Sequence, residues 1–186
     1  MSAERTRVDL SRFDNASFPK GAGAVKMTLW YFTNVFFFLN PAFPFRSVKP
    51  GLLRLFGAKV GKRVVIHPGV NIKYPWFLSV GDHCWIGEGV WIDNLAQVTL
   101  GSHVCLSQGA MLLTGNHDYT KPSFNLITQP IVLEDGVWVG ARALVGPGAV
   151  LRTHAVLSAG SVGTGELEAY AVYRGNPAVW VRKRVP

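Results

Sequence analysis

The sequence predicts an all-β protein built as a parallel β-helix. The first observation is a six-residue period in residues 133–162, where five consecutive units are LEDGVW, VGARAL, VGPGAV, LRTHAV and LSAGSV. The second is that every unit begins with an aliphatic residue and has a small or β-branched residue at its fifth position. The third is the content of 20 glycines and 11 prolines, which suits many tight turns. A period of six fits neither an α-helix nor an open sheet, but it is typical of short strands stacked in coils.

Residues 1–59 are expected to form an N-terminal arm followed by a helical segment. Small, polar and turn-forming residues break any periodicity in residues 1–24, which predicts an irregular arm. The mostly apolar run 27–39 predicts a helix that ends before Asn40-Pro41. Residues 48–57 predict a short second helix that ends at Gly57.

Two placements are open for the aromatic segment 25–45. It is too short to cross a membrane, which takes about 20 apolar residues. It can flank the repeat domain and bury its aromatic face there, which is the preferred placement. Alternatively, it can lie peripherally at the inner face of a membrane, with lysines and arginines facing anionic lipid. The span between Asp14 and Asp82 contains no acidic residue, which is compatible with the second placement.

The net charge and the cysteine content limit which partners and which cellular compartment are expected. The formal net charge is +8, and a second basic cluster closes the chain at residues 182–184. Basic surfaces attract anions such as phosphorylated cofactors and acidic lipids. Nucleic acid is not an expected partner, because no recognised binding motif accompanies these charges. Two cysteines suggest no disulfide framework and the polar start predicts no signal peptide, so a cytoplasmic location is expected.

The repeat domain is predicted to span residues 60–165 in about five coils of three units each. Two steps between leading positions are eight residues instead of six, from Ile72 to Val80 and from Ile92 to Leu100. Both extra pairs then fall at the same corner of a coil, which supports the register. Coils are expected about 4.8 Å apart, and each buried Leu, Ile or Val contributes about 1.5–3 kcal/mol.

One long segment, residues 113–132, interrupts the repeat between Leu112 and Leu133. It is too long for a corner, and long loops on rigid scaffolds are where binding and catalysis concentrate. Past Val162 the pattern decays, and residues 166–186 predict a basic tail or a short helix after a turn at 175–177.

The sixes, the loop TGNHDY, the restart QPIVLEDGVWVGARALVGPGAV and the terminal YRGNPA resemble the hexapeptide-repeat acyltransferases. The match is to the maltose, galactoside and colanic-acid-type O-acetyltransferases, and it covers residues 60–180. The resemblance implies a left-handed helix and a homotrimer that binds acetyl-CoA as co-substrate between two subunits. It also implies a saccharide acceptor, free or lipid-linked, in the synthesis of a surface polysaccharide.

His117 is the predicted general base. An alcohol is a poor nucleophile at neutral pH, and a histidine can accept the hydroxyl proton and pass it to the leaving thiolate. The matching histidine does this in the family. Two partners for it stay open, the adjacent Asp118 and Asp93 one coil below. The residues expected to contact the acceptor are Asn94, Asn116 and Tyr119.

The resemblance also implies the contacts of the donor. The pantetheine arm runs beside small residues that map to Ala141, Ala159 and Thr164, and Trp138 maps to a tryptophan that flanks the cleft.

Two departures from the family pattern bear on the ligands. Family members often carry a lysine soon after the last repeat, where this chain has Gly165, so Arg182, Lys183 or Arg152 is expected to serve the phosphates instead. Galactoside-type members have an asparagine where this chain has Gly87, which argues against a galactoside or maltose acceptor.

Two other functions stay open. A γ-carbonic-anhydrase-like enzyme would bind zinc between subunits through His83, His103 and His117. That family places a second histidine five residues after one of its ligands, and position 122 is Pro, so no metal is expected. A non-catalytic β-helix for binding or assembly would be insensitive to His117→Ala.

Overall fold

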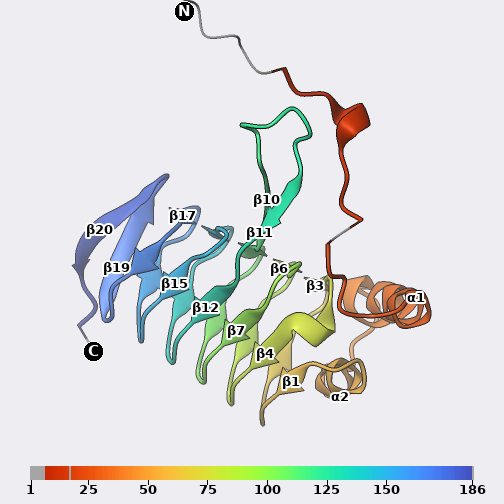
Figure 1. Cartoon of the computed structure of the whole chain (residues 1–186). Helices are drawn as coiled ribbons and strands as arrows, with labels where there is room; N and C mark the ends of the chain where they lie inside the picture. The colour runs from red at the N-terminus through yellow and green to blue at the C-terminus, as the bar shows by residue number, and fades with distance from the viewer. Residues whose placement is uncertain (1–6, 17, 186) are drawn as a thin grey trace, which may run out of the picture.

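The computed structural model describes residues 7–16 and 18–185, and its repeat domain is a solenoid with three walls of parallel strands (Figure 1). The first wall contains, in spatial order, β1 (Lys59–Val60), β4 (Leu78–Val80), β7 (Val98–Leu100), β12 (Ile131–Leu133), β15 (Val150–Leu151) and β18 (Glu166–Leu167). The second contains β2 (Val65–Ile66), β5 (Trp85–Ile86), β8 (Cys105–Leu106), β13 (Trp138–Val139), β16 (Val156–Leu157), β19 (Ala171–Gly175) and β20 (Ala178–Lys183). The third contains β3 (Asn71–Ile72), β6 (Trp91–Asp93), β9 (Met111–Leu113), β14 (Leu144–Val145) and β17 (Val162–Gly163).

The leading residue of each six-residue unit points into the solenoid, as predicted. In the second wall Ile86 pairs with Ile66 on one side and Leu106 on the other. All three side chains are completely buried. Stacked aliphatic columns therefore form the core, since each coil covers the apolar positions of its neighbours.

The solenoid extends one coil beyond the predicted five, because the first wall has six strands. The expected short helix or tail after residue 166 is corrected as well. Strand β18 continues the first wall, and β19 and β20 form an antiparallel hairpin on the second. The hairpin is rich in β-branched and aromatic residues, such as Val172, Tyr173 and Trp180, which favour strands. Its pairing with β16 also satisfies the backbone groups of that strand.

The N-terminal helices close the first end of the solenoid. Helix α1 (Ala24–Thr33) continues into the π-helical segment η2 (Asn34–Leu39), and α2 (Val48–Leu55) follows. Trp30, Phe38 and Leu53 are buried in the same core as the strands. The indole N–H of Trp30 donates to the carbonyl of Ile72 at 2.9 Å. The flanking placement is thus confirmed for this face of the helices, while their outer face stays exposed (Figure 1).

None of the helices in the described part of the chain is both long and apolar enough to cross a membrane.

The long loop leaves the solenoid without disturbing it. Strand β12 pairs directly with β7, so the first wall continues across the insertion. The loop itself is an antiparallel hairpin of β10 (Gly115–His117) and β11 (Leu126–Thr128), which stands out from the coils (Figure 1).

The N-terminal arm runs along this loop. In the part of the arm that the structure describes, the regular structure is the short 3₁₀ helix η1 (Leu10–Arg12). The backbone N–H of Asp9 donates to the carbonyl of Pro122 at 2.8 Å, and that of Asp14 donates to Asn125 Oδ1 at 3.4 Å. The arm is therefore attached to the loop that was predicted to carry the base.

Candidate active site

His117 ends strand β10, and its ring is held by Phe124 on the other side of the loop. Its Nδ1 lies 2.9 Å from the carbonyl oxygen of Phe124. The two aromatic rings stack with centroids 4.4 Å apart and planes 6° from parallel. A carbonyl can only accept a hydrogen bond, so Nδ1 carries the proton in the neutral ring. The lone pair is then on Nε2, where a general base needs it.

Phe124 presents its carbonyl because its backbone takes an unusual conformation. Its φ is +48°, in the left-handed region that is rare for a bulky residue. Its N–H donates to the carbonyl of Lys121 at 3.1 Å, which closes the turn around it. Every residue type has a backbone carbonyl, so the sequence did not indicate that Phe124 is this partner.

Asp118, one of the two expected partners of His117, is engaged elsewhere. Its Oδ1 accepts from the hydroxyl of Thr120 at 2.5 Å and from the N–H of the same residue at 3.2 Å. Its Oδ2 lies 3.1 Å from Lys121 Nζ. The Thr120 hydrogen bonds, with help from Lys121, lower the pKa of Asp118. This carboxylate therefore stabilises the turn of the loop.

Asp93, the other expected partner, shares a cavity with His117. Its Oδ1 forms an ion pair with Lys73 Nζ at 3.2 Å, and that oxygen is buried without a well-directed hydrogen bond. The backbone carbonyl of Asp93 accepts from Thr114, where the loop begins. Asp93 thus lies at the base of the loop, next to the space in front of the imidazole.

This cavity has a volume of about 440 Å³ and is built from the arm, the loop and the third wall. The aromatic ring of Phe13 lies 5.8 Å from that of His117. The arm, to which the sequence assigned no role, is therefore part of the site. The lining residues are Phe13, Asn15, Phe18, Lys20, Lys73, Tyr74, Asp93, Leu95, Gly115, Asn116, His117 and Leu126.

The three residues expected to contact the acceptor lie in different environments. Asn116 lines the cavity. Asn94 is completely buried, and its amide exchanges two hydrogen bonds with the backbone of Tyr74, at 3.0 and 2.6 Å. The prediction for Asn94 is therefore corrected, because a buried and fully engaged amide positions Tyr74 and cannot touch an acceptor. Tyr119 is 73 % exposed and is not among the residues that line the cavity.

The residues expected to bind the donor lie at another edge of the solenoid. Trp138 is in the second wall, 47 % exposed, and its indole N–H donates to Ser107 Oγ at 2.9 Å. Ala141 and Ala159 follow the paired strands β13 and β16, and the N–H of Gly160 donates to the carbonyl of Ala141 at 2.9 Å. A Cβ built on Gly160 would meet no atom within 4 Å, so this corner is open to an extended ligand.

The other donor candidates are on the third wall and the terminal hairpin. Thr164 follows β17 and is exposed, while Arg182 and Lys183 are exposed on β20. None of these residues is among the described residues that line the cavity at His117. His117 lies between the third and first walls, whereas Ala141 and Ala159 lie between the second and third.

Solved structures share this architecture. A hexapeptide-repeat acetyltransferase from Vibrio cholerae, solved with acetyl coenzyme A, superposes with a TM-score of 0.78 at 22% identity, over 89% of this chain and 92% of that one. A galactoside acetyltransferase in complex with coenzyme A also gives a TM-score of 0.78, at 20% identity over 93% of this chain and 86% of that one. At these identities the likeness shows the fold.

Sequence comparison decides the family. No family model matches the chain. WcaF of Escherichia coli (strain K12), named for a role as colanic acid biosynthesis acetyltransferase, is 40% identical over 178 residues, covering 95% of this chain and 97% of WcaF. The chain belongs to the hexapeptide-repeat acetyltransferases.

The three histidines that the zinc alternative would use lie at two different edges of this hexapeptide-repeat acetyltransferase. Among residues 7–16 and 18–185, no group of three or more His, Cys, Asp or Glu is arranged to hold a metal ion. The rings of His83 and His103 stack 5.0 Å apart, between the first and second walls, away from the edge that carries His117.

Proposed function

We propose that this acetyltransferase moves the acetyl group of acetyl-CoA to a hydroxyl of a saccharide in the biosynthesis of a surface polysaccharide. The observation that carries the proposal is the imidazole of His117, fixed at Nδ1 by Phe124 with Nε2 left to act as a base. The similarity to WcaF over nearly the whole chain supports the polysaccharide context.

The chemistry proposed for the site is direct transfer. His117 Nε2 takes the proton of the acceptor hydroxyl as its oxygen attacks the thioester carbonyl. The carbon–sulfur bond breaks, and the imidazolium returns the proton to the leaving thiolate. The Phe124 carbonyl accepts a hydrogen bond from Nδ1–H throughout, so the ring keeps its orientation while Nε2 gains and loses the proton.

We expect the working form to be a homotrimer with the donor between subunits. The base and the small residues at the donor corner lie at different edges of one chain, so one chain cannot bring them together. A cyclic trimer places one edge of each subunit against a different edge of its neighbour, which supplies the missing half of each site.

The test of the function is release of thiol from acetyl-CoA against a panel of saccharides. His117→Gln keeps a similar size but removes the base, and it is expected to lower kcat by about 10²–10⁴-fold while the KM for acetyl-CoA changes little. Equal turnover by the variant and the wild type would rule out His117 as the base, whereas no thiol release by the wild type with any saccharide would favour the non-catalytic β-helix.

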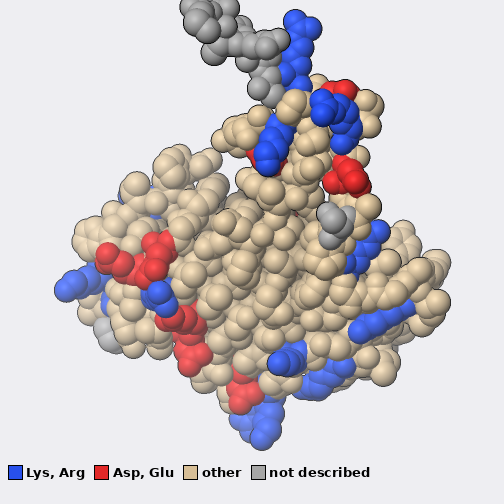
Figure 2. Space-filling model, viewed as in Figure 1, with Lys and Arg blue, Asp and Glu red and all other residues tan. Residues whose placement is uncertain are grey.

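We also propose that the outer face of the N-terminal helices contacts the inner surface of a membrane. Val25, Leu29, Phe32 and Phe36 follow one face of α1 and η2, and each is more than half exposed. Lys and Arg side chains gather over this part of the molecule on the face shown in Figure 2. Exposed apolar side chains on a part of the molecule that also carries cations are typical of a peripheral contact with anionic lipid.

Sedimentation with vesicles tests this contact. Binding to vesicles that contain anionic lipid is expected at low salt, and it should weaken as salt screens the attraction of about 1 kcal/mol per basic residue. The double variant Phe32→Ser/Phe36→Ser should stay in the supernatant. Failure of the wild type to sediment at low salt would rule the contact out.

A further inference from the structure

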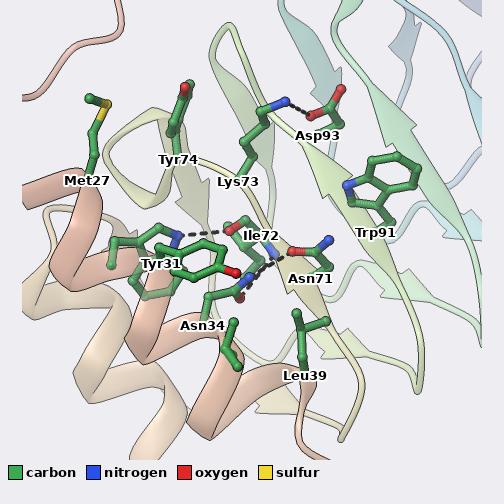
Figure 3. A pocket seen from close by; sticks show the side chains of 12 residues that line it. Met27, Tyr31, Asn34, Leu39, Asn71, Ile72, Lys73, Tyr74, Trp91 and Asp93 are labelled. Carbon is green, nitrogen blue, oxygen red and sulfur yellow. Dashed lines mark hydrogen bonds and ion pairs between the residues drawn. The ribbon is translucent and has the colours of Figure 1, made fainter. Parts of the chain in front are cut away.

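A second cavity continues from the one at His117. It has a volume of about 380 Å³ and lies between α1, η2 and the third wall (Figure 3). Lys73, Tyr74 and Asp93 line both cavities. The two therefore form one trough that runs from the imidazole to the N-terminal helices, and we call it the acceptor trough.

The helical end of the acceptor trough is apolar. Its lining there includes Met27, Tyr31, Val35, Leu39 and Trp91. Tyr31 is 61% exposed, Leu39 37% and Trp91 39%, so these large side chains meet water in the free protein. An exposed apolar strip that continues a catalytic cavity marks a binding surface.

The polar groups between the helices and the third wall are engaged with each other. The indole N–H of Trp30 is bonded to the carbonyl of Ile72, and Asn34 Nδ2 donates to Asn71 Oδ1 at 2.8 Å (Figure 3). These groups already form hydrogen bonds within the protein. A hydrocarbon chain that covers them would therefore break no hydrogen bonds to water, which lowers the desolvation free energy of binding the chain.

The junction of the two cavities carries a positive charge. Lys73 is at the junction, with its side chain 44% exposed and its ammonium 3.2 Å from Asp93. Lys20 lines the His117 side. Two cations against one carboxylate leave one charge uncompensated, which favours an anion at this point.

We propose that the natural acceptor is an amphiphile, a saccharide joined through a phosphate to a hydrocarbon chain. The saccharide occupies the cavity at His117, the phosphate lies at Lys73 and Lys20, and the chain covers Tyr31, Leu39 and Trp91. The acetylation of its head group rests on the function proposed above, whereas its binding does not.

Calorimetric titration with decyl phosphate below its micelle concentration tests the acceptor trough without knowledge of the saccharide. Decyl phosphate is expected to bind at least about tenfold more tightly than inorganic phosphate, because the chain buries apolar surface. Lys73→Gln should weaken the binding of decyl phosphate by about tenfold and leave the binding of uncharged decyl glucoside almost unaffected. Tyr31→Ser/Leu39→Ser should weaken the binding of both ligands.

A matched control separates the acceptor trough from general adhesion. Val48→Ser/Leu55→Ser removes two residues of the same helical cap that are 42% and 77% exposed but lie outside the trough and outside the face proposed to contact a membrane. This variant should bind decyl phosphate like the wild type. Equal weakening by the control, or inorganic phosphate binding as tightly as decyl phosphate, would overturn the proposal.

His117→Gln distinguishes this proposal from the proposed function. It should bind decyl phosphate normally while losing acetyl transfer. If the wild type binds decyl phosphate as expected but transfers acetyl to no saccharide, the acceptor trough stands and the proposed function fails.

Discussion

At the scale of single residues, the imidazole of His117 is oriented by a main-chain atom. The carbonyl of Phe124 accepts from Nδ1, and the ring of Phe124 lies against the imidazole face. A hydrogen bond to a main-chain carbonyl is retained in every variant that preserves the turn. The turn itself depends on Asp118, which accepts hydrogen bonds from Thr120.

Asp118→Asn tests whether a carboxylate is needed next to the base. The amide keeps an oxygen for Thr120 and loses only an ion pair with the exposed Lys121, which solvent screens. We therefore expect kcat/KM for acetyl transfer to fall by no more than about threefold. Loss of the carboxylate from a catalytic triad costs about 10⁴-fold in comparison.

Thiol release from acetyl-CoA provides the measurement, with His117→Gln as the inactive reference. A hundredfold loss in Asp118→Asn, with thermal unfolding unchanged, would mean that the carboxylate reaches the imidazole once the acceptor is bound.

The sequence singled out His117 but not all of its surroundings. His117 could be proposed as the base because it lies in the one break of a regular pattern. The burial of Asn94 was also within reach, since side chains alternate along a strand and Ile92 is a leading, inward position. The Phe124 carbonyl and the nearby Phe13 were not, because backbone conformation and contacts distant in sequence leave no local pattern.

At the scale of the elements, helix α2 buries a lysine that has no carboxylate partner among residues 7–16 and 18–185. Lys49 is completely buried, and its Nζ donates to the carbonyl of His67 at 2.9 Å and lies 5.6 Å from the centre of the Phe38 ring. Burial, followed by the nearby charge of Arg46, lowers the pKa of Lys49 from its ordinary value of 10.5. The helix is thus docked by a group whose charge costs free energy when it is buried.

Lys49→Met should remove a pH dependence of stability. Between the lowered pKa of the folded state and 10.5, the unfolded chain binds more protons, so the free energy of unfolding of the wild type should rise with pH there. The variant lacks this rise, and near pH 7 it should be as stable as the wild type or more stable by about 1 kcal/mol.

Urea unfolding of both proteins at neutral and alkaline pH checks this expectation. Lys59→Met, which replaces an exposed lysine of β1, is the control and should keep the rise. The expectation is wrong if Lys49→Met and the wild type gain the same stability on going to alkaline pH.

The elements were predictable where composition and periodicity agree. The helices at 24–39 and 48–55 follow from apolar runs that end at proline and glycine. The C-terminal hairpin was missed because its basic residues suggested a tail. Its strand character depends on pairing with β16, which is a tertiary contact.

At the scale of the whole molecule, the three-walled solenoid separates the proposed base from the proposed donor residues. The period of six was sufficient to predict the walls and their aliphatic columns. It could not show which edge meets a second subunit, because that depends on surfaces outside the repeat.

Complementation between two inactive variants tests the sharing of sites. His117→Gln lacks the base, and Ala141→Trp places a bulky ring at the donor corner, so each variant alone should be inactive. If the sites lie between subunits, co-expression should restore about a third of the sites in every mixed trimer. Size-exclusion chromatography confirms that both variants assemble, and no recovery in mixed trimers would place the whole site within one chain.

The direct pairing of β7 with β12 across the insertion has an evolutionary consequence. The coils close beneath the hairpin, so mutations, insertions and deletions at its tip can accumulate with little effect on folding. Selection can therefore retune which hydroxyl is modified while the architecture inherited by the lineage stays constant. Divergence among descendants should concentrate in this excursion and in the arm that accompanies it.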